Sequence, residues 1–394
     1  MSKKVTREEM LDRAKSLVPA IKARAAETEK LGQLHPDTVK ELIDTGLWRI
    51  VQPARVGGSE LDYTLIIEAT QHIGSACGST GWAFSNLSSH HWMVAMYNEK
   101  AQNAVWDDDP ETLVATSVIY PAGRAKKVKG GFELTGRWPF CSGIMHSGFA
   151  ILGGLVEGES KDAPMEPRMF LVAKSDLEIH ETWDVIGLAG TGSKDVSCDK
   201  LFLPDYMALG AHECMGDPTP GSAVNPAPLY RLPVAALFAH LISGPILGMA
   251  TGIYNTVVEG LQGQISTYNK SRVADHQTTH LRVSKAGAQL DAARIVMVDN
   301  CNEAMRIAES GRAPNTEEKF RWRRDSAFTT QLCADAADQL YRGTGASAIY
   351  NRNSLPQQYR DINAGLVHIG ISWDVNGGEY GKVILGLDPA NKNI

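Results

Sequence analysis

The chain has 394 residues, which is longer than one ordinary domain and favours about two or three of them. Hydrophobic residues make up 43% and charged residues 21%, a balance that is typical of a globular chain and excludes wholesale disorder. The 39 basic and 45 acidic side chains give a net charge of −6, so the sequence carries no basic footprint for nucleic acid or for an anionic membrane.

Residues 1–110 are predicted to form an N-terminal α-helical domain. Apolar residues between Leu11 and Ala25 recur at steps of three and four, which places them on one face of an amphipathic helix. A second helix is expected from Pro36, a tolerated first-turn proline, to Gly46, which can close it. Two further helical segments follow, Leu65 to Ile73 and Ala101 to Trp106.

Residues 111–210 change character and are predicted to form a middle β-barrel domain. Two runs on either side of Gly130 and Gly131 indicate a hairpin, with strands at 125–128 and 132–136. Other β-rich or apolar runs bounded by turn residues lie at 112–120, 149–156, 169–173 and 201–204. Short strands at this spacing are typical of a barrel or a sandwich.

Residues 211–394 begin with a loop rich in Gly, Pro and Asp and are then predicted to form a C-terminal helical bundle. Small and aliphatic residues at 281–296 and at 333–340 form stripes that suit close-packed helices. The stretch from Leu232 to Val258 contains no charged residue, but two prolines interrupt it and no basic clusters flank it. We interpret it as a buried bundle helix rather than a membrane anchor.

Cysteine usage and the N-terminus favour a reducing cytoplasm. The six cysteines never form a CxxC pair, so neither a disulfide framework nor a zinc ribbon is indicated. The N-terminal sequence MSKKVTREEMLDRAK has basic residues but no apolar core, so we do not interpret it as a signal peptide.

Several familiar motifs lack the sequence context that their function requires. Gly343 to Ala348 fits the G-x-G-x-x-A pattern, but a helical stretch precedes it where a dinucleotide fold needs a strand. Gly187 to Lys194 nearly spells a phosphate loop, with its Lys and Ser in the wrong order. No HExxH or GxSxG occurs, and the adjacent His90 and His91 point in different directions, so we predict no metal site and no nucleophile elbow.

Two blocks in the middle region combine a flat aromatic residue, a small hydroxyl and glycines: Trp138 to Gly143 and Trp183 to Ser193. Such a combination suits a planar ring system that lies against backbone, with hydroxyls meeting its heteroatoms. A tight turn with a packed tryptophan explains the same residues, and spacing alone does not separate the two interpretations.

The blocks Gly136 to Gly143, Trp183 to Val196 and Arg360-Asp361 with His368 resemble the acyl-CoA dehydrogenase superfamily. They are more similar to its oxygenase branch, the group D two-component flavin-dependent monooxygenases, which includes the hydroxylases of 3-hydroxy-9,10-secoandrostatriene-dione and 4-hydroxyphenylacetate. The resemblance covers nearly the whole chain. It implies an α+β fold with an N-terminal helical domain, a middle β-barrel and a C-terminal four-helix bundle, assembled as a homotetramer in which a neighbouring subunit completes each flavin site.

One position separates the two branches. Common acyl-CoA dehydrogenases place a glutamate base shortly after the Arg-Asp pair, and the matching position here holds Ile369, which cannot take a proton. The resemblance therefore implies the oxygenase component of a monooxygenase that hydroxylates an aromatic, phenolic substrate through a C4a-hydroperoxyflavin. It implies reduced FMN as the cofactor with FAD as the alternative, O2, and a separate NAD(P)H-dependent flavin reductase. An FAD-dependent acyl-CoA dehydrogenase or oxidase with its base elsewhere is the alternative function, and a silent binding protein of this fold is a third.

The resemblance also assigns site residues. His368 is the main candidate for acid–base work, His90 for a polar contact with the substrate hydroxyl, and Ser142 for a contact with flavin N5, whose hydrogen its hydroxyl can accept. Arg272 matches an arginine that reaches a neighbour's flavin phosphate. The other cofactor-binding candidates are Trp138, Phe140, Trp183, Thr191, Ser193, Gly343, Thr344 and Gly345. The competing interpretations are ordinary ones: a turn cap, barrel packing, a solvated charge and satisfied core histidines.

Overall fold

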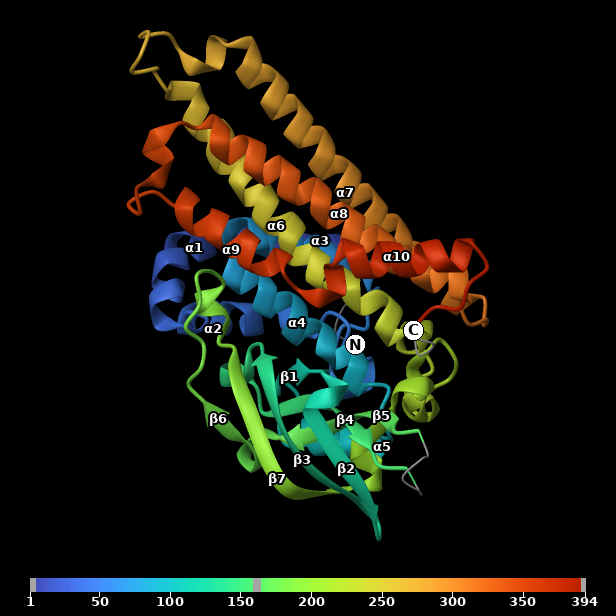
Figure 1. Ribbon diagram of the computed structural model, residues 1–394. Coiled ribbons are helices and arrows are strands. Elements are labelled where there is room, and N and C mark those ends of the chain that lie inside the picture. Colours follow the sequence, from blue (N-terminus) through green and yellow to red (C-terminus); the bar gives the residue numbers. More distant parts are fainter. Residues whose placement is uncertain (1–4, 159–163, 391–394) are drawn as a thin grey trace.

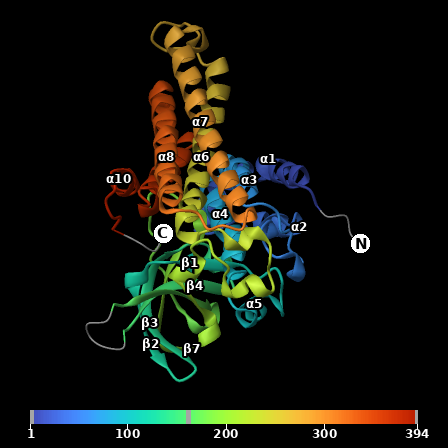
Figure 2. The same cartoon turned by 90° about the vertical axis from the view of Figure 1, so that its right-hand side faces the viewer.

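The computed structural model describes residues 5–158 and 164–390. Helices α3 (Thr64–Ala76) and α4 (Gly78–Val94) lie at the centre, between a sheet on one side and long C-terminal helices on the other (Figures 1 and 2). The other N-terminal helices are α1 (Arg7–Leu31), α2 (Pro36–Asp44) and α5 (Glu99–Trp106).

Local signals set the ends of the first helices. Thr6 and Glu9 form a reciprocal capping box at the start of α1, and Gly32 ends that helix in the left-handed conformation. Pro36 occupies the first turn of α2, as predicted. The helices predicted within residues 65–73 and 101–106 are confirmed as α3 and α5.

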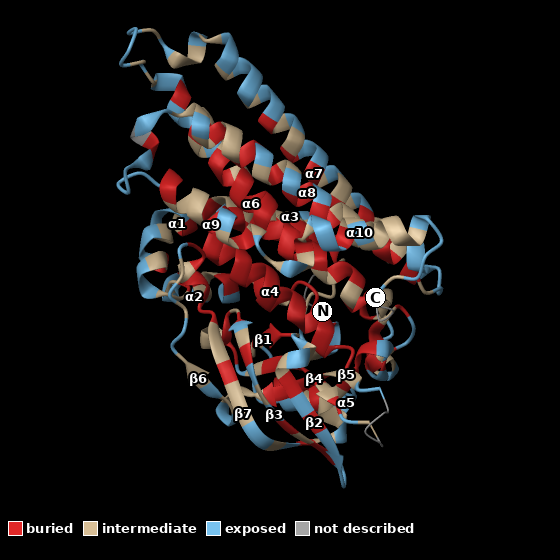
Figure 3. Ribbon diagram, in the orientation of Figure 1, coloured by how far each residue is buried: buried red, intermediate tan, exposed pale blue. Residues whose placement is uncertain are grey.

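Helix α4 is the central element that the sequence does not predict. All of its residues are buried, and Figure 3 shows it at the middle of the molecule. A helix that is covered on every side has no polar face and therefore no amphipathic period. It packs against α3 and α6 (Val234–Gly263), and its far end reaches β1 (Val114–Ser117).

The middle region forms one mixed sheet. Its strands run in the order β6-β7-β3-β2-β4-β5-β8, and β1 pairs in parallel with β4. The predicted hairpin is confirmed as β2 and β3, which turn at Gly130 and Gly131. The strands are β1 (Val114–Ser117), β2 (Gly123–Val128), β3 (Gly131–Cys141), β4 (Phe149–Val156), β5 (Glu166–Ala173), β6 (Glu178–His180), β7 (Lys194–Pro204) and β8 (Ala208–Gly210).

The prediction of a β-barrel is wrong, because the sheet is open. A barrel closes only when its two outermost strands pair with each other. Here β6 pairs with β7 and β8 pairs with β5, and among the described residues no ladder joins β6 to β8. Each of these two edge strands is only 3 residues long.

The helices after the sheet form a helical C-terminal domain. The long helices α6, α7 and α8 pack together, and α9 and α10 pack against them. Helix α6 is long and apolar enough to cross a membrane, but 83% of its most apolar window is buried by protein, as predicted for a bundle helix. The five helices are α6 (Val234–Gly263), α7 (Gln277–Glu309), α8 (Thr316–Gly343), α9 (Leu355–Leu366) and α10 (Trp373–Ile384).

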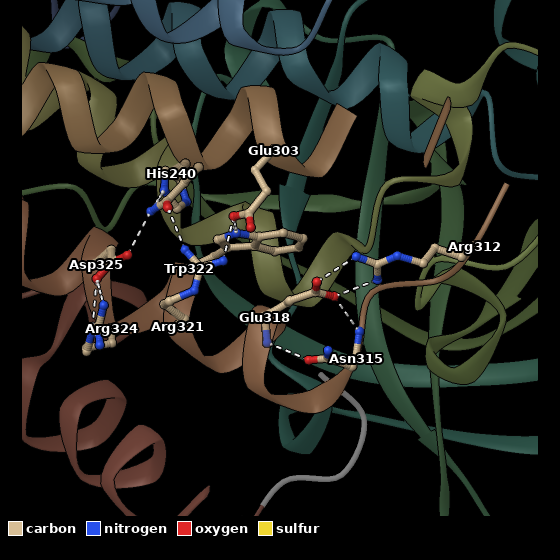
Figure 4. A network of polar contacts seen from close by, with 10 residues as sticks. His240, Glu303, Arg312, Asn315, Glu318, Arg321, Trp322, Arg324 and Asp325 are labelled. Atoms are coloured by element: carbon tan, nitrogen blue, oxygen red, sulfur yellow. Dashed lines mark hydrogen bonds and ion pairs between the residues drawn. The ribbon is translucent and has the colours of Figure 1, made fainter. Parts of the chain in front are cut away.

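A polar network ties the three long helices together (Figure 4). Asn300 of α7 donates to Asp325 of α8 at 3.2 Å and lies 3.4 Å from Nε2 of His240 in α6. Glu303 of α7 accepts a hydrogen bond from Trp322 Nε1 of α8 at 2.8 Å. A buried polar group that loses its partner costs free energy, so this network favours one arrangement of the helices.

Candidate active site

Ser142 lies where β3 ends beside β1. The register of β3 against β7 shifts just before Cys141, and Phe140 in this bulge has a φ of 60°, which is rare for a residue other than glycine. Ser142 then pairs with Thr116 of β1. A bulge bends its strand, and here it turns the end of β3 toward α4 and the loop before β7.

A chain of hydrogen bonds surrounds Ser142. Its Oγ accepts from Trp82 Nε1 of α4 at 3.3 Å and from the Ser193 hydroxyl at 3.0 Å. Ser193 Oγ lies 2.7 Å from Thr191 Oγ1, which donates to the Leu188 carbonyl at 2.9 Å. Ser193 and Thr191 are fully buried, whereas Ser142 is half-buried. Ser142 is therefore the hydroxyl through which this group can reach a ligand.

Leu188 is the backbone junction of the loop between β6 and β7. It has a left-handed φ of 56°, its N–H donates to Asp361 Oδ1 at 2.7 Å, and its carbonyl also accepts from Trp183 Nε1 at 3.0 Å. The preceding Gly187 lies so close to α9 that a Cβ would stand 2.3 Å from the Arg360 carbonyl oxygen. The loop is therefore clamped on α9 at the Arg-Asp pair.

Asp361 makes this clamp from a buried position, with 1% of the residue exposed. Burial raises the pKa of Asp361 from its ordinary 3.8 to about 7, against the opposing effect of the Leu188 N–H bond. A buried carboxylate is costly when it is charged, so the carboxyl group is partly protonated near neutral pH.

We expect the free energy of unfolding of Asp361→Asn to lose a pH dependence that the wild type has. The folded pKa of about 7 lies above the unfolded value, so the folded chain binds the proton more tightly. Asp361 therefore lowers stability as the pH rises from about 4 to about 7. Asn keeps an acceptor for the Leu188 N–H and does not titrate, whereas Asp361→Leu leaves that N–H unpaired and costs about 1–3 kcal/mol.

Urea unfolding of the three proteins at about pH 5 and pH 8 measures this effect. The stability of the wild type relative to Asp361→Asn should fall by more than about 1 kcal/mol between the two pH values. A difference that stays constant with pH would show that Asp361 keeps an ordinary pKa in the folded protein.

Trp82 links Ser142 to His368. Its ring lies 5.9 Å from the His368 ring, centroid to centroid, at an angle of 62°. His368 Nδ1 accepts the backbone N–H of Gly370 at 3.0 Å, so the neutral ring carries its proton on Nε2. Burial lowers the pKa of His368 to about 4. The ring is therefore neutral near pH 7 and offers Nε2–H as a hydrogen-bond donor.

His90 is fully buried in α4 and both of its ring nitrogens have partners. Nδ1 lies 2.6 Å from the Val114 carbonyl and donates to it, and Nε2 lies 3.1 Å from Thr116 Oγ1. Burial lowers the pKa of His90 to about 4. The structure brings His90 to Thr116, which pairs with Ser142, but its contact with a substrate stays a prediction.

The predicted aromatic residues divide into two environments. Phe140 and Trp183 meet edge to face with their centroids 6.2 Å apart, and Phe140 is 62% exposed. Trp138 is fully buried instead, and its Nε1 donates to the Gly153 carbonyl at 2.6 Å within the sheet. Apolar side chains are also exposed in the flanking segments, at Ile186, Val367 and Ile369. Exposed apolar surface beside a half-buried hydroxyl and a histidine donor fits a planar, heteroatom-edged ring such as a flavin.

The remaining cofactor candidates lie at the far end of the long helices. Arg272 is exposed in the connection between α6 and α7, which stands away from the sheet in both views (Figures 1 and 2). Gly343 ends α8, and the Thr344 carbonyl accepts from Gln264 Nε2 at 3.1 Å in the same region; Gly345 follows with a φ of 78°. A groove of ~490 Å³ runs here along the end of α6. One chain thus does not bring these residues to Ser142.

Sequence reasoning assigns no role to Trp82, Leu188 or Asp361, which hold the site together. Asp361 stands inside a block that carries the family resemblance, and that is the signal that marks it. Leu188 acts through its backbone alone, so its side-chain type carries no signal.

Comparison with known proteins agrees with this geometry. Models of the acyl-CoA dehydrogenase N-terminal and C-terminal domains match residues 6–106 and 240–373. The chain is 33% identical to the flavin-dependent monooxygenase oxygenase subunit HsaA of Rhodococcus jostii, over 91% of this chain and 93% of that one. It is 29% identical to the FADH2-dependent resorcinol hydroxylase oxygenase component of a Rhizobium species, over 96% and 95%. The crystal structure of HsaA from M. tuberculosis superposes with a TM-score of 0.93, at 32% identity over 99% and 100%.

The fold and the two matching domain models define an acyl-CoA dehydrogenase-like protein. Within that superfamily the chain belongs to the family of flavin-dependent monooxygenase oxygenase subunits, as the predicted resemblance states.

Proposed function

We propose that this protein is the oxygenase component of a two-component monooxygenase that hydroxylates a phenolic substrate with reduced flavin and O2. The observation that carries the proposal is the position of Trp82, which donates a hydrogen bond to Ser142 and packs against the His368 ring. The substitution of Ile369 for the dehydrogenase base supports it. The names of the relatives, an oxygenase subunit and an oxygenase component, support a separate NAD(P)H-dependent reductase.

The bound reduced flavin would supply the activation of O2, which no side chain of this site provides. Ser142 would hydrogen-bond the edge of the flavin ring, and Phe140 and Trp183 would shield its surface from water. His368 would hold the substrate oxygen with Nε2–H. A phenol of pKa ~10 and a histidine of pKa about 4 differ by roughly 6 units, or about 8 kcal/mol, so His368 does not remove the phenol proton outright. As a donor it would stabilise the negative charge on the substrate oxygen while the phenol proton passes to water, and the ring is then richer in electrons.

The preferred flavin is a separate part of the proposal. Reduced FMN follows from the family resemblance, whereas the name of the resorcinol hydroxylase states FADH2. Equilibrium titration with each reduced flavin under anaerobic conditions measures the preference directly.

We further propose a homotetramer in which the far end of one chain completes the site of a neighbour. Within one chain, the α6–α7 connection and the end of α8 stand away from the sheet (Figures 1 and 2), and this separation supports the assembly. A guanidinium suits the phosphate of a flavin nucleotide. Light scattering of the purified protein measures the mass of the particle, and a monomer or dimer would contradict the proposal.

The function is tested with a panel of phenols and indoles. The protein receives reduced flavin from any flavin reductase in air, and mass spectrometry looks for a product heavier by one oxygen atom. Conversion of a phenol is the expected result. Bleaching of bound FAD by an acyl-CoA under anaerobic conditions would instead identify a dehydrogenase, and failure to bind flavin in either redox state would identify a silent member of the fold.

A further inference from the structure

Helix α10 is attached to the long helices through one buried amide. Asn376 of α10 is 1% exposed, and its Oδ1 accepts a hydrogen bond from Arg323 Nε of α8 at 2.9 Å. Arg323 in turn donates from Nη1 to the Ala235 carbonyl of α6 at 2.7 Å. Helix α10 packs against α8 (Figure 1), so this amide is connected through one guanidinium to two of the three long helices.

The other end of the same amide holds the turn that follows His368. Asn376 Nδ2 donates to the Gly370 carbonyl at 3.1 Å and to the Ser372 carbonyl at 2.9 Å. An arginine can only donate and a carbonyl can only accept, so the amide fits its partners in one orientation. Two carbonyls of one turn are thereby fixed with respect to α6 and α8.

Gly370 connects this amide to the His368 ring. Residues Ile369–Ile371 form a single 3₁₀ turn, and the Gly370 N–H within it donates to His368 Nδ1 at 3.0 Å. A Cβ at Gly370 would stand 3.0 Å from the same ring nitrogen, so the ring lies directly against the backbone of the turn. A short 3₁₀ turn has poor hydrogen-bond geometry and is marginal by itself. The direction of the Gly370 N–H therefore depends on contacts that hold the turn from outside.

We propose that Asn376 is a positioning residue for His368, which acts through the Gly370 backbone and keeps the ring proton on Nε2. The inference rests on the proposed function, in which Nε2–H holds the substrate oxygen. A neutral imidazole can carry its proton on either nitrogen, and the hydrogen bond at one nitrogen decides the form. The Gly370 N–H stabilises the form with a lone pair on Nδ1, and it does so only while the turn keeps it aimed at the ring.

Asn376→Asp removes both donors and keeps the contact with Arg323. A carboxylate has nearly the shape of the amide, and it accepts from a guanidinium more strongly than an amide does. It cannot donate, and it repels the Gly370 and Ser372 carbonyls. The turn should therefore move while α10 stays attached to α8.

Asn225→Asp is the matched control, because Asn225 makes the same kinds of contact elsewhere. It is buried in the connection between β8 and α6, and its Oδ1 accepts from Arg55 Nε at 3.2 Å. Its Nδ2 donates to the Ala95 carbonyl at 2.9 Å. Both substitutions bury one carboxylate beside an arginine and remove donors to backbone, so a general loosening of the fold should appear in both.

The first experiment is ¹⁵N NMR of the histidine rings in the purified full-length protein near pH 7. The signals of His368 are those that His368→Ala lacks. The two nitrogens of a single tautomer have widely separated shifts, whereas exchange between the tautomers averages them. We expect a wide separation in the wild type and in Asn225→Asp, and a narrower one in Asn376→Asp. An unchanged separation in Asn376→Asp would overturn the inference, and the measurement needs neither flavin nor substrate.

The second experiment connects the position of the ring to the reaction. A misplaced reacting group costs up to about 10²-fold in rate, and we expect Asn376→Asp to lower the product formed per reduced flavin oxidised by about tenfold. In the His368→Ala background the same substitution should change this yield by less than about twofold, because its effect passes through the missing ring. Equal losses in the two backgrounds would contradict a positioning role. If the wild type forms no product from any phenol, the proposed function fails, and the NMR result still decides whether Asn376 positions His368.

Discussion

Replacement of His368 by alanine is expected to lower product formation by at least about 100-fold, while reduced flavin and O2 are still consumed. General acid–base groups contribute about 10²–10⁴-fold to rates, and His368 offers the Nε2–H donor beside Trp82. Without that donor the negative charge that develops on the substrate oxygen during the attack loses its hydrogen bond, and the ring is a weaker nucleophile. The measurement is product formed against hydrogen peroxide released, per reduced flavin oxidised.

His368→Gln is the matched variant for this prediction. A glutamine amide can donate from the position of Nε2, but it cannot take up a proton at any working pH. Partial recovery of product in His368→Gln over His368→Ala is the result that a donor role predicts. A wild-type product yield in His368→Ala would remove this residue from the mechanism.

The low pKa of His368 leads to a second expectation, on pH dependence, which the same variants test. Burial keeps the pKa of His368 near 4, so the ring is neutral from about pH 5 upward. The product yield should therefore depend on pH in the same way in the wild type and in His368→Gln between pH 5 and pH 9.

The local part of the fold could be predicted from the sequence. Helix α1 has a capping signal and an apolar stripe, and the β2–β3 hairpin has its glycine turn, so neighbouring residues specify both. Helix α4 has no polar face and gives no such period. Closure of the sheet depends on whether β6 meets β8, two short strands about thirty residues apart whose pairing no local pattern encodes.

The site divides in the same way. The resemblance assigns Ser142 and His368, and the structure adds that Trp82 contacts both. The link from Leu188 to Asp361 joins segments separated by 173 positions and uses a backbone N–H, so no side-chain pattern reveals it. Trp138 is the opposite case. Its motif indicates a contact with the flavin, but its side chain packs inside the sheet.

Replacement of Ser142 by alanine is expected to increase the hydrogen peroxide released per product at least about tenfold. Ser142 is the half-buried end of the hydroxyl chain and the contact proposed for the flavin edge. A tenfold change corresponds to about 1.4 kcal/mol, which is the size of one hydrogen bond in a protein. Its signature differs from that of His368, because Ser142→Ala should also oxidise reduced flavin faster when no phenol is present.

Ser147→Ala is the matched control for this prediction. Ser147 is buried a few residues further along the same segment, and its hydroxyl donates to the Gly143 carbonyl at 3.0 Å without contacting Ser193 or Trp82. Both substitutions remove one hydroxyl from the connection between β3 and β4, so an equal rise in peroxide for the two would reflect a loosened segment and refute a flavin contact. A rise confined to Ser142→Ala assigns the effect to the one hydroxyl that reaches the site.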